Sequence, residues 1–108
     1  MNAFEITQLI TACKQSNDYY LEFLRVPSLS AGIYMLPAGG VDPQEPHTED
    51  EVYYVVSGRG SIQVDTESRP VEAGSVVFVG AKVDHRFHSI TENLVLLVLF
   101  APAEYSQA

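Results

Sequence analysis

Short runs of β-forming residues, separated by turn-forming residues, make up nearly the whole chain after residue 18. Gly- and Pro-containing clusters such as Pro37-Ala-Gly-Gly40 and Ala73-Gly74 stand between the runs. The runs themselves cover residues 19–26, 31–36, 52–56, 61–65, 69–72, 75–79, 84–89 and 94–100. Many short strands with turn signals between them are typical of an all-β sandwich or barrel.

The middle of the chain contains two different strand patterns. Residues 52–56 are an uninterrupted apolar run, which predicts a strand buried on both faces. Residues 61–65 alternate polar and apolar side chains, which predicts a strand with one face in the core. Gly58-Arg59-Gly60 between them predicts a turn with Arg59 at a solvated tip, and Thr91-Glu-Asn93 predicts a polar break later in the chain.

The N-terminal segment differs from the rest because its apolar residues recur at helical spacing. Asn2 and Glu5 match the pattern of a capping box, so we expect a short amphipathic helix over residues 2–14. We expect residues 1–18 to form a helical segment packed on a barrel domain of residues 19–108. The apolar stripe consists of Ile6, Leu9, Ile10 and Cys13. A thiol on such a stripe is expected to be a small buried hydrophobe rather than a reactive group.

The length and net charge of the chain limit the functions that it can have. A chain of 108 residues fits one domain with a real core. The formal net charge of −8 opposes binding to nucleic acid and to anionic membranes. The longest apolar run, 94–103, is far shorter than the roughly 20 residues that span a bilayer. The start of the chain lacks the features of a secretory signal, and a single cysteine is compatible with a reducing compartment, so we expect a cytoplasmic location.

The loop before residue 52 carries the groups most suited to chemistry. It holds His47 and, without any Lys or Arg, five carboxylates: Asp42, Glu45, Glu49, Asp50 and Glu51. Like charges this close repel one another and raise each other's pKa unless a positive group lies between them. A divalent cation would supply that charge, and the alternative is a solvated acidic loop.

A second histidine could complete a metal site. His85 lies 38 residues after His47 and opens the run of 84–89. Two imidazoles and the Glu51 carboxylate with open positions would form the facial triad of non-haem Fe(II) sites, although Mn, Ni, Co or Zn would also accept these ligands.

The spacing of these residues resembles the two sequence motifs of the cupin family. In the first motif, Gly39, His47, Glu51 and Gly58 fall on the expected Gly, second His, Glu and final Gly. The first His of that motif is replaced by Glu45.

The second motif is matched less completely. Gly74 and His85 fall on its leading Gly and its His. The motif's Pro, inner Gly and terminal Asn are replaced here by Gly80, Lys82 and Ser89.

The resemblance implies a small double-stranded β-helix, or jelly-roll barrel, with a metal ion in its mouth. His47, Glu51 and His85 would be ligands of a divalent transition metal. The fourth ligand would be Glu45, or Gln44 if Pro46 shifts the strand register, or water. A further reading is that this chain has lost its metal.

Strand alternation then predicts which side chains face the barrel interior. If Glu51 faces inward, Tyr53 does too, and Tyr54 lies on the outer face. If His85 faces inward, Phe87 and Ser89 share its face while His88 points out. Tyr53, Phe87 and Ser89 are therefore the candidates for a substrate pocket, with core packing as the alternative for Tyr53. Glu49 and Asp50 are expected to face solvent.

Two functions are consistent with the resemblance. One is a small-molecule metalloenzyme of dioxygenase, isomerase or epimerase, or decarboxylase or lyase type. The other is a non-catalytic barrel that binds a small molecule or a partner and has lost part of its metal site. In either case we expect a homodimer, because Tyr54 and the apolar strand 94–100 would otherwise leave an uncovered outer face.

Overall fold

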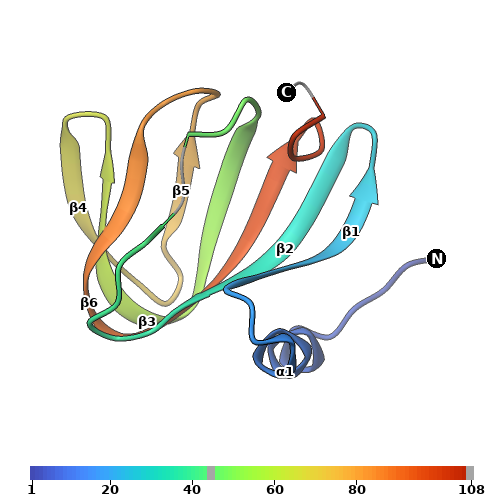
Figure 1. The fold of residues 1–108 in the computed structure, drawn as a ribbon, viewed down its shortest axis with the longest axis horizontal. Coiled ribbons are helices and arrows are strands. Elements are labelled where there is room, and N and C mark those ends of the chain that lie inside the picture. The colour runs from blue at the N-terminus through green and yellow to red at the C-terminus, as the bar shows by residue number, and fades with distance from the viewer. Residues whose placement is uncertain (44–45, 107–108) are drawn as a thin grey trace.

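The computed structural model of the chain describes residues 1–43 and 46–106. Within these ranges it confirms the prediction of an all-β fold with a short N-terminal helix, as Figure 1 shows. The elements in order are α1 (Ile6–Ser16), β1 (Tyr20–Val26), β2 (Leu29–Leu36), β3 (Asp50–Val64), β4 (Glu67–Glu72), β5 (Val76–Val79) and β6 (His85–Ala101).

The strands form one antiparallel sheet that rolls over on itself. Its order is β1-β2-β6-β3-β4, with β5 paired to β3. The first part of β3 pairs with the last part of β6, for example Tyr53 with Val98, and the last part of β3 pairs with the start of β6, as Val64 does with His85. Register shifts between Val55 and Ser61 separate the two parts. Such bulges bend a strand, so the two long strands pass from one wall of the barrel to the other (Figure 1).

Two predicted interruptions are therefore wrong. Gly58-Arg59-Gly60 is no turn but part of the bulged segment of β3, and Thr91-Glu-Asn93 continues β6. Gly58 has a φ of 98°, and a Cβ there would lie 2.1 Å from the backbone oxygen of Asn93. Residues that favour turns are used here to bend paired strands closely around each other. Arg59 stays exposed, but it forms ion pairs across the sheet to Glu72 and Glu92.

The helix begins later than predicted. Glu5 is its N-cap and makes no side-chain capping bond, so the capping box of Asn2 and Glu5 is not formed. The helix ends at Ser16, and Asn17 adopts the left-handed conformation that commonly terminates helices. With 11 residues, α1 is too short to cross a membrane, and the described part of the chain holds no other helix.

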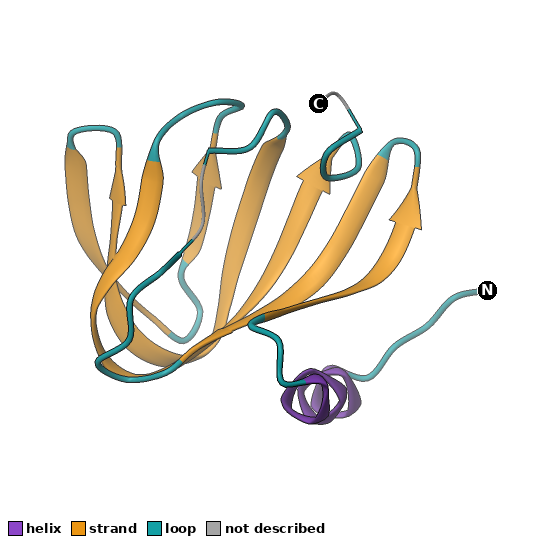
Figure 2. Cartoon of the chain, viewed as in Figure 1, coloured by secondary structure: helices purple, strands orange, loops and turns teal. Residues whose placement is uncertain are grey.

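The helix covers part of the outer face of the sheet. Cys13 is 1% exposed and packs with Ile33 and Val95, which confirms its predicted role as a buried hydrophobe. Figure 2 shows the helix on the side of the sheet away from the barrel interior. The prediction that residues 52–56 are buried on both faces is wrong, because Tyr54 is exposed. This exposure agrees with the prediction from strand alternation that Tyr54 lies on the outer face.

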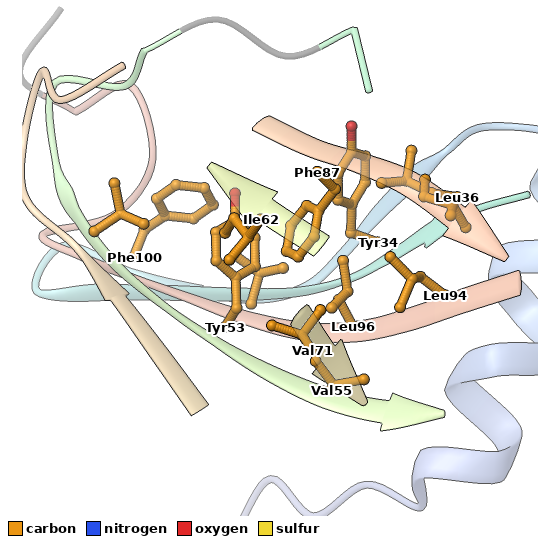
Figure 3. Packing of buried hydrophobic residues seen from close by; sticks show 13 residues of the cluster. Tyr34, Leu36, Tyr53, Val55, Ile62, Val71, Phe87, Leu94, Leu96 and Phe100 are labelled. Carbon is orange, nitrogen blue, oxygen red and sulfur yellow. The ribbon is translucent and has the colours of Figure 1, made fainter. Parts of the chain in front are cut away.

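The barrel interior holds the main core. Residues from both walls meet there, and Figure 3 shows Tyr53, Phe87 and Phe100 among the aliphatic side chains of β2, β3 and β6. The rings of Tyr53 and Phe87 pack edge to face at 4.9 Å. Burying each such ring stabilises the fold by about 1.5–3 kcal/mol, so the core holds the two walls together below the barrel mouth.

Candidate metal centre

The predicted ligands come from three different places in the fold. His47 lies in the loop that leads into β3, Glu51 is the second residue of β3, and His85 is the first residue of β6. In the sheet, Glu51 pairs with Phe100, whereas His85 pairs with Val64 at the opposite end of β3. Strand pairing alone would leave the two residues far apart. They meet because the rolled sheet turns both inner faces toward the same interior.

The structure brings the three side chains together. His85 Nε2 lies 2.8 Å from Glu51 Oε1, and His47 Nδ1 lies 3.6 Å from the same oxygen. One ligand atom from each residue can be chosen so that all three lie within 4.8 Å of one another. The residues are only 6%, 2% and 2% exposed for His47, Glu51 and His85.

Each imidazole is oriented by a partner on its other nitrogen. His85 Nδ1 donates to the backbone oxygen of Val83 at 2.9 Å. His47 Nε2 lies 2.8 Å from Glu104 Oε2. A carbonyl or carboxylate in this position fixes the ring and leaves the remaining nitrogen for a metal. His85 Nε2 and His47 Nδ1 both face Glu51, so the orientation suits a shared ion.

The electrostatics of the cluster couple the imidazoles to the carboxylates. Burial lowers the pKa of His47, but the nearby carboxylates of Glu104 and Glu51 outweigh burial and raise the pKa to about 9. Burial also lowers the pKa of His85, and its bond to Glu51 reverses this to a net increase. Burial raises the pKa of Glu51, but the two imidazoles bring it below its usual value. Without a metal, protons therefore bridge the cluster.

Two buried atoms show that the cluster fits a cation. Among the described residues, His47 Nδ1 and Glu51 Oε2 have no hydrogen-bond partner, although both are shielded from water. Leaving such groups unpaired costs about 1–3 kcal/mol each. A divalent ion between His47, Glu51 and His85 would satisfy both atoms. Two nitrogens and one oxygen are a donor set that transition metals accept, with positions left open.

Two described carboxylates of the acidic loop, Asp42 and Glu49, are buried rather than solvated. Asp42 accepts a hydrogen bond from the hydroxyl of Tyr34 and another from the backbone N–H of Phe87 at 2.9 Å. Glu49 is buried, so its predicted exposure is wrong: it accepts from the backbone N–H of Tyr105 at 2.8 Å and from Thr48. Asp50 is exposed, as predicted. The carboxylates thus fasten the loop to both walls of the barrel.

The proposed fourth ligands fall outside the described residues. These are Glu45 and its alternative Gln44.

The three pocket candidates lie in different environments. The hydroxyl of Tyr53 lies 3.1 Å from His85 Nε2, and its ring lines a cavity next to His47. Phe87 is buried in the core and packs against the ring of Tyr53. The prediction that Ser89 faces the interior is wrong, because its φ of 51° breaks the alternation of β6 and leaves Ser89 exposed while Ile90 is buried. His88 contacts Ser68 at 2.8 Å, away from the cluster, as its parity predicts.

Sequence reasoning missed Glu104. This residue lies just after β6, where the chain curls back beside β2 (Figure 1). Its backbone N–H donates to Ser30 Oγ at 2.9 Å, and its backbone oxygen accepts from Arg25 at 2.8 Å. No local pattern marks a carboxylate near the end of a chain as a partner of His47, so only the fold reveals it.

Comparison with known proteins identifies the family. The sequence profile described as "Cupin domain" matches residues 32–100. This chain belongs to the cupin family. An uncharacterized protein of Streptomyces coelicolor is 48% identical to this cupin over 104 residues, which are 96% of this chain and 99% of that protein.

Solved structures share the fold. A protein of Bacillus halodurans superposes with a TM-score of 0.78 at 17% identity, over 94% of this cupin and 80% of that chain. The DMSP lyase DddQ of Ruegeria pomeroyi gives a TM-score of 0.69 at 22% identity, over 78% of this cupin and 47% of that chain. This cupin therefore matches only about half of the lyase, and at such low identity the likeness shows the fold alone.

Proposed function

We propose that this cupin is a small-molecule metalloenzyme that holds a divalent transition metal on His47, Glu51 and His85. The observation that carries the proposal is that two buried atoms inside this cluster, His47 Nδ1 and Glu51 Oε2, have no hydrogen-bond partner among the described residues. The reaction classes that suit such a site are those of dioxygenases, isomerases or epimerases, and decarboxylases or lyases. The presence of a lyase among the proteins of this fold is compatible with the last class.

Each residue of the cluster would have a separate role. A bound metal would supply a Lewis acid or a site for activating dioxygen. Glu104 holds the His47 ring through Nε2, and the Val83 carbonyl holds the His85 ring through Nδ1. The Tyr53 hydroxyl, next to His85 and on the wall of the cavity, is placed to donate a hydrogen bond to a substrate oxygen.

Elemental analysis of the purified protein tests the proposal. We expect about one transition metal ion per chain after reconstitution, and loss of that ion in His47→Ala. His88→Ala is the matched control, because His88 lies outside the cluster, and it should keep the metal. Metal content that stays well below one ion per chain after reconstitution would refute the metalloenzyme.

A second candidate is a non-catalytic small-molecule-binding cupin. The observation that favours it is that the buried residues already pair with each other, Glu51 with His85 and Glu104 with His47, both at 2.8 Å. Such pairing holds the cluster together with protons in place of a metal. A protein that takes up no metal yet binds a small molecule in the barrel mouth would favour this candidate.

A homodimer is also part of the proposal. Four exposed apolar side chains lie together on the outer face of the sheet, and we call them the outer apolar patch: Tyr54, Val76, Phe78 and Leu99. They are adjacent because Tyr54 pairs with Val76, and Val52 pairs with both Phe78 and Leu99. Contiguous exposed apolar surface of this kind marks interaction sites, and a second copy of the chain is the partner we propose.

A further inference from the structure

Three strands, β1, β4 and β5, each pair with only one other described strand and therefore present a free edge. Such edges invite pairing with another chain, and proteins protect them with bulges, prolines or charged side chains. β1 has a register shift between Glu22 and Leu24, and β4 contains Pro70 among charged residues. β5 has none of these devices, because its sequence Val76-Val-Phe-Val79 is uncharged and contains no proline. Figure 1 shows β5 at the end of the wall opposite to β1, so β5 is an unprotected edge of this wall.

The hydrogen bonds between β3 and β5 show which backbone groups of β5 face its free edge. The N–H of Val55 in β3 donates to the oxygen of Ser75 at 2.9 Å. Bonded positions alternate along antiparallel strands, so Val77 also bonds to β3. Val76 and Phe78 then turn their N–H and C=O groups away from β3, where no described residue offers a backbone partner. The side chains of the same two residues are exposed on the outer face.

The free edge of β5 is short because the chain turns away at both of its ends. Before the strand, the N–H of Ser75 donates to the oxygen of Glu72 at 2.9 Å. After the strand, the oxygen of Gly80 accepts from the N–H of Val83 at 3.2 Å. A long extended peptide would therefore find few groups to bond. A strand as short as β5 itself matches the length of the edge.

A cleft of about 250 Å³ lies between β5 and β4. Its apolar lining includes Ile62 and Val77, and its polar lining includes Glu67 and Arg69 of β4. Within the described part of the chain, neither Glu67 nor Arg69 forms an ion pair, and Arg69 donates only to the backbone oxygen of Pro70 at 3.3 Å. The cleft thus combines an apolar floor with one unmatched negative charge and one unmatched positive charge.

We propose that β5 pairs with β5 of a second copy of the chain, antiparallel about a two-fold axis at Val77, so that two sheets become one. The inference rests on the homodimer of the proposed function and adds how the two copies join. Under this symmetry, Val76 of each copy bonds to Phe78 of the partner subunit, and the free N–H and C=O groups of both residues find partners. Their side chains form aromatic–β-branched pairs across the seam, which stabilise neighbouring strands.

Charge favours a second copy as the occupant of this edge. Two chains with a net charge of −8 repel each other, and an uncharged strand is where they approach at the least cost. The two-fold axis also places both β4 strands on the same side of the joined sheet, where Arg69 of one copy faces Glu67 of the other. A pair of short strands buries less than the roughly 1,200–2,000 Å² of a stable interface, so this second contact is part of the proposal.

Amide hydrogen exchange of the full chain, resolved by NMR, tests this inference. We expect the amides of Val76 and Phe78 to exchange at least about tenfold more slowly in the dimer than in the monomer obtained by dilution. The amide of Val77, which bonds to β3, should be protected in both states. A dimer in which the exchange of Val76 and Phe78 equals that of the monomer would overturn edge pairing and leave the homodimer in place. A wild-type monomer at all concentrations would overturn both, and neither result bears on metal binding.

A proline at the first position of β5 tests the same hydrogen bonds by substitution. Val76→Pro removes an N–H that faces the free edge, and proline is tolerated at the first residue of an edge strand. Unchanged protection of the Val77 amide checks that the fold persists, and sedimentation should then give the mass of a single chain. Val76→Thr is the matched control, because it keeps the N–H and the β-branched shape, and it should stay dimeric. A folded Val76→Pro that remains a dimer would overturn the inference.

Discussion

At the scale of single residues, the site combines one buried carboxylate, Glu51, with two buried imidazoles, and these three groups shift each other's pKa. Glu51 lies between His47 and His85, and Glu104 lies on the far side of His47. Each ion pair is shielded from water, so removal of one partner leaves the other buried without compensation. The cluster is therefore sensitive to pH and to substitution in ways that exposed pairs are not.

The metal-free protein should lose stability as the pH rises. The pKa of His47 is raised from 6.5 to about 9 in the folded chain, so its pairing stabilises the fold fully below about pH 6.5. This stabilisation falls as the pH rises from there and is lost above about pH 9. The raised pKa of His85 acts in the same direction. Urea denaturation with chelator present at pH 6, 7.5 and 9.5 measures this. His47→Gln should flatten the profile and His88→Gln should not; stability that increases over this interval would contradict the account.

Glu104 should act on metal affinity through His47. Glu104→Ala leaves His47 Nε2 without its partner, and we expect it to weaken zinc binding about 10–100-fold. Glu104→Gln keeps an oxygen acceptor and should restore part of the affinity. Competition with a chromophoric chelator gives the dissociation constants, and Glu92→Gln, in an exposed pair with Arg59, is the control. Unchanged zinc affinity in Glu104→Ala would show that this carboxylate has no positioning role.

Sequence spacing could predict part of this site and not the rest. His47, Glu51 and His85 were found because motif spacing places them at the starts of two strands. The contact of Glu104 with His47 and the contact of Asp42 with Phe87 were not predicted, because the rolled sheet brings together residues that lie far apart in the sequence. Ser89 was misplaced because alternation assumes a regular strand, and the positive φ of Ser89 breaks it.

At the scale of elements, two long bent strands create the barrel. The strands β3 and β6 each contribute to both walls, and the bends occur where the register shifts. Sequence patterns found most strands but split these two, because Gly58-Arg59-Gly60 and Thr91-Glu-Asn93 have the composition of turns. The same residue types occur in β-bulges, and only pairing with a neighbouring strand distinguishes a bulge from a turn.

Gly58 should be harder to replace with alanine than Gly74. Gly58→Ala combines positive-φ strain with a contact of 2.1 Å to the Asn93 backbone oxygen, so we expect a loss of roughly 2–5 kcal/mol in unfolding free energy. Gly74→Ala is the matched control: its φ is also positive, but nothing lies within 4 Å of the new Cβ. It should cost only about 1–2 kcal/mol. Equal losses in the two variants, measured by urea denaturation, would argue against close packing at the bend.

At the scale of the whole molecule, the rolled sheet has one filled face and one partly covered face. The interior is packed and carries the cluster at its mouth. The outer face is covered by α1 over Ile33 and Val95, but the outer apolar patch remains open to solvent. Val76 and Phe78, both on β5, are 65% and 63% exposed, although Val and Phe are among the residue types most often buried.

The dimer proposal predicts that one charge on this patch separates the subunits. Sedimentation equilibrium should give twice the chain mass of 11.9 kDa for the wild type and the single mass for Phe78→Asp. Val26→Asp is the control, because Val26 is also exposed but lies outside the patch. The proposal would be refuted by a wild-type monomer, or by a dimer that persists in Phe78→Asp.

An anomalous scattering map from crystals grown with a transition metal shows whether the three side chains share an ion. We expect one strong peak between His47 Nδ1, Glu51 and His85 Nε2, at metal–nitrogen distances of about 2.0–2.1 Å. Crystals in which Glu51 still pairs directly with His85, with no peak between the three side chains, would contradict this expectation.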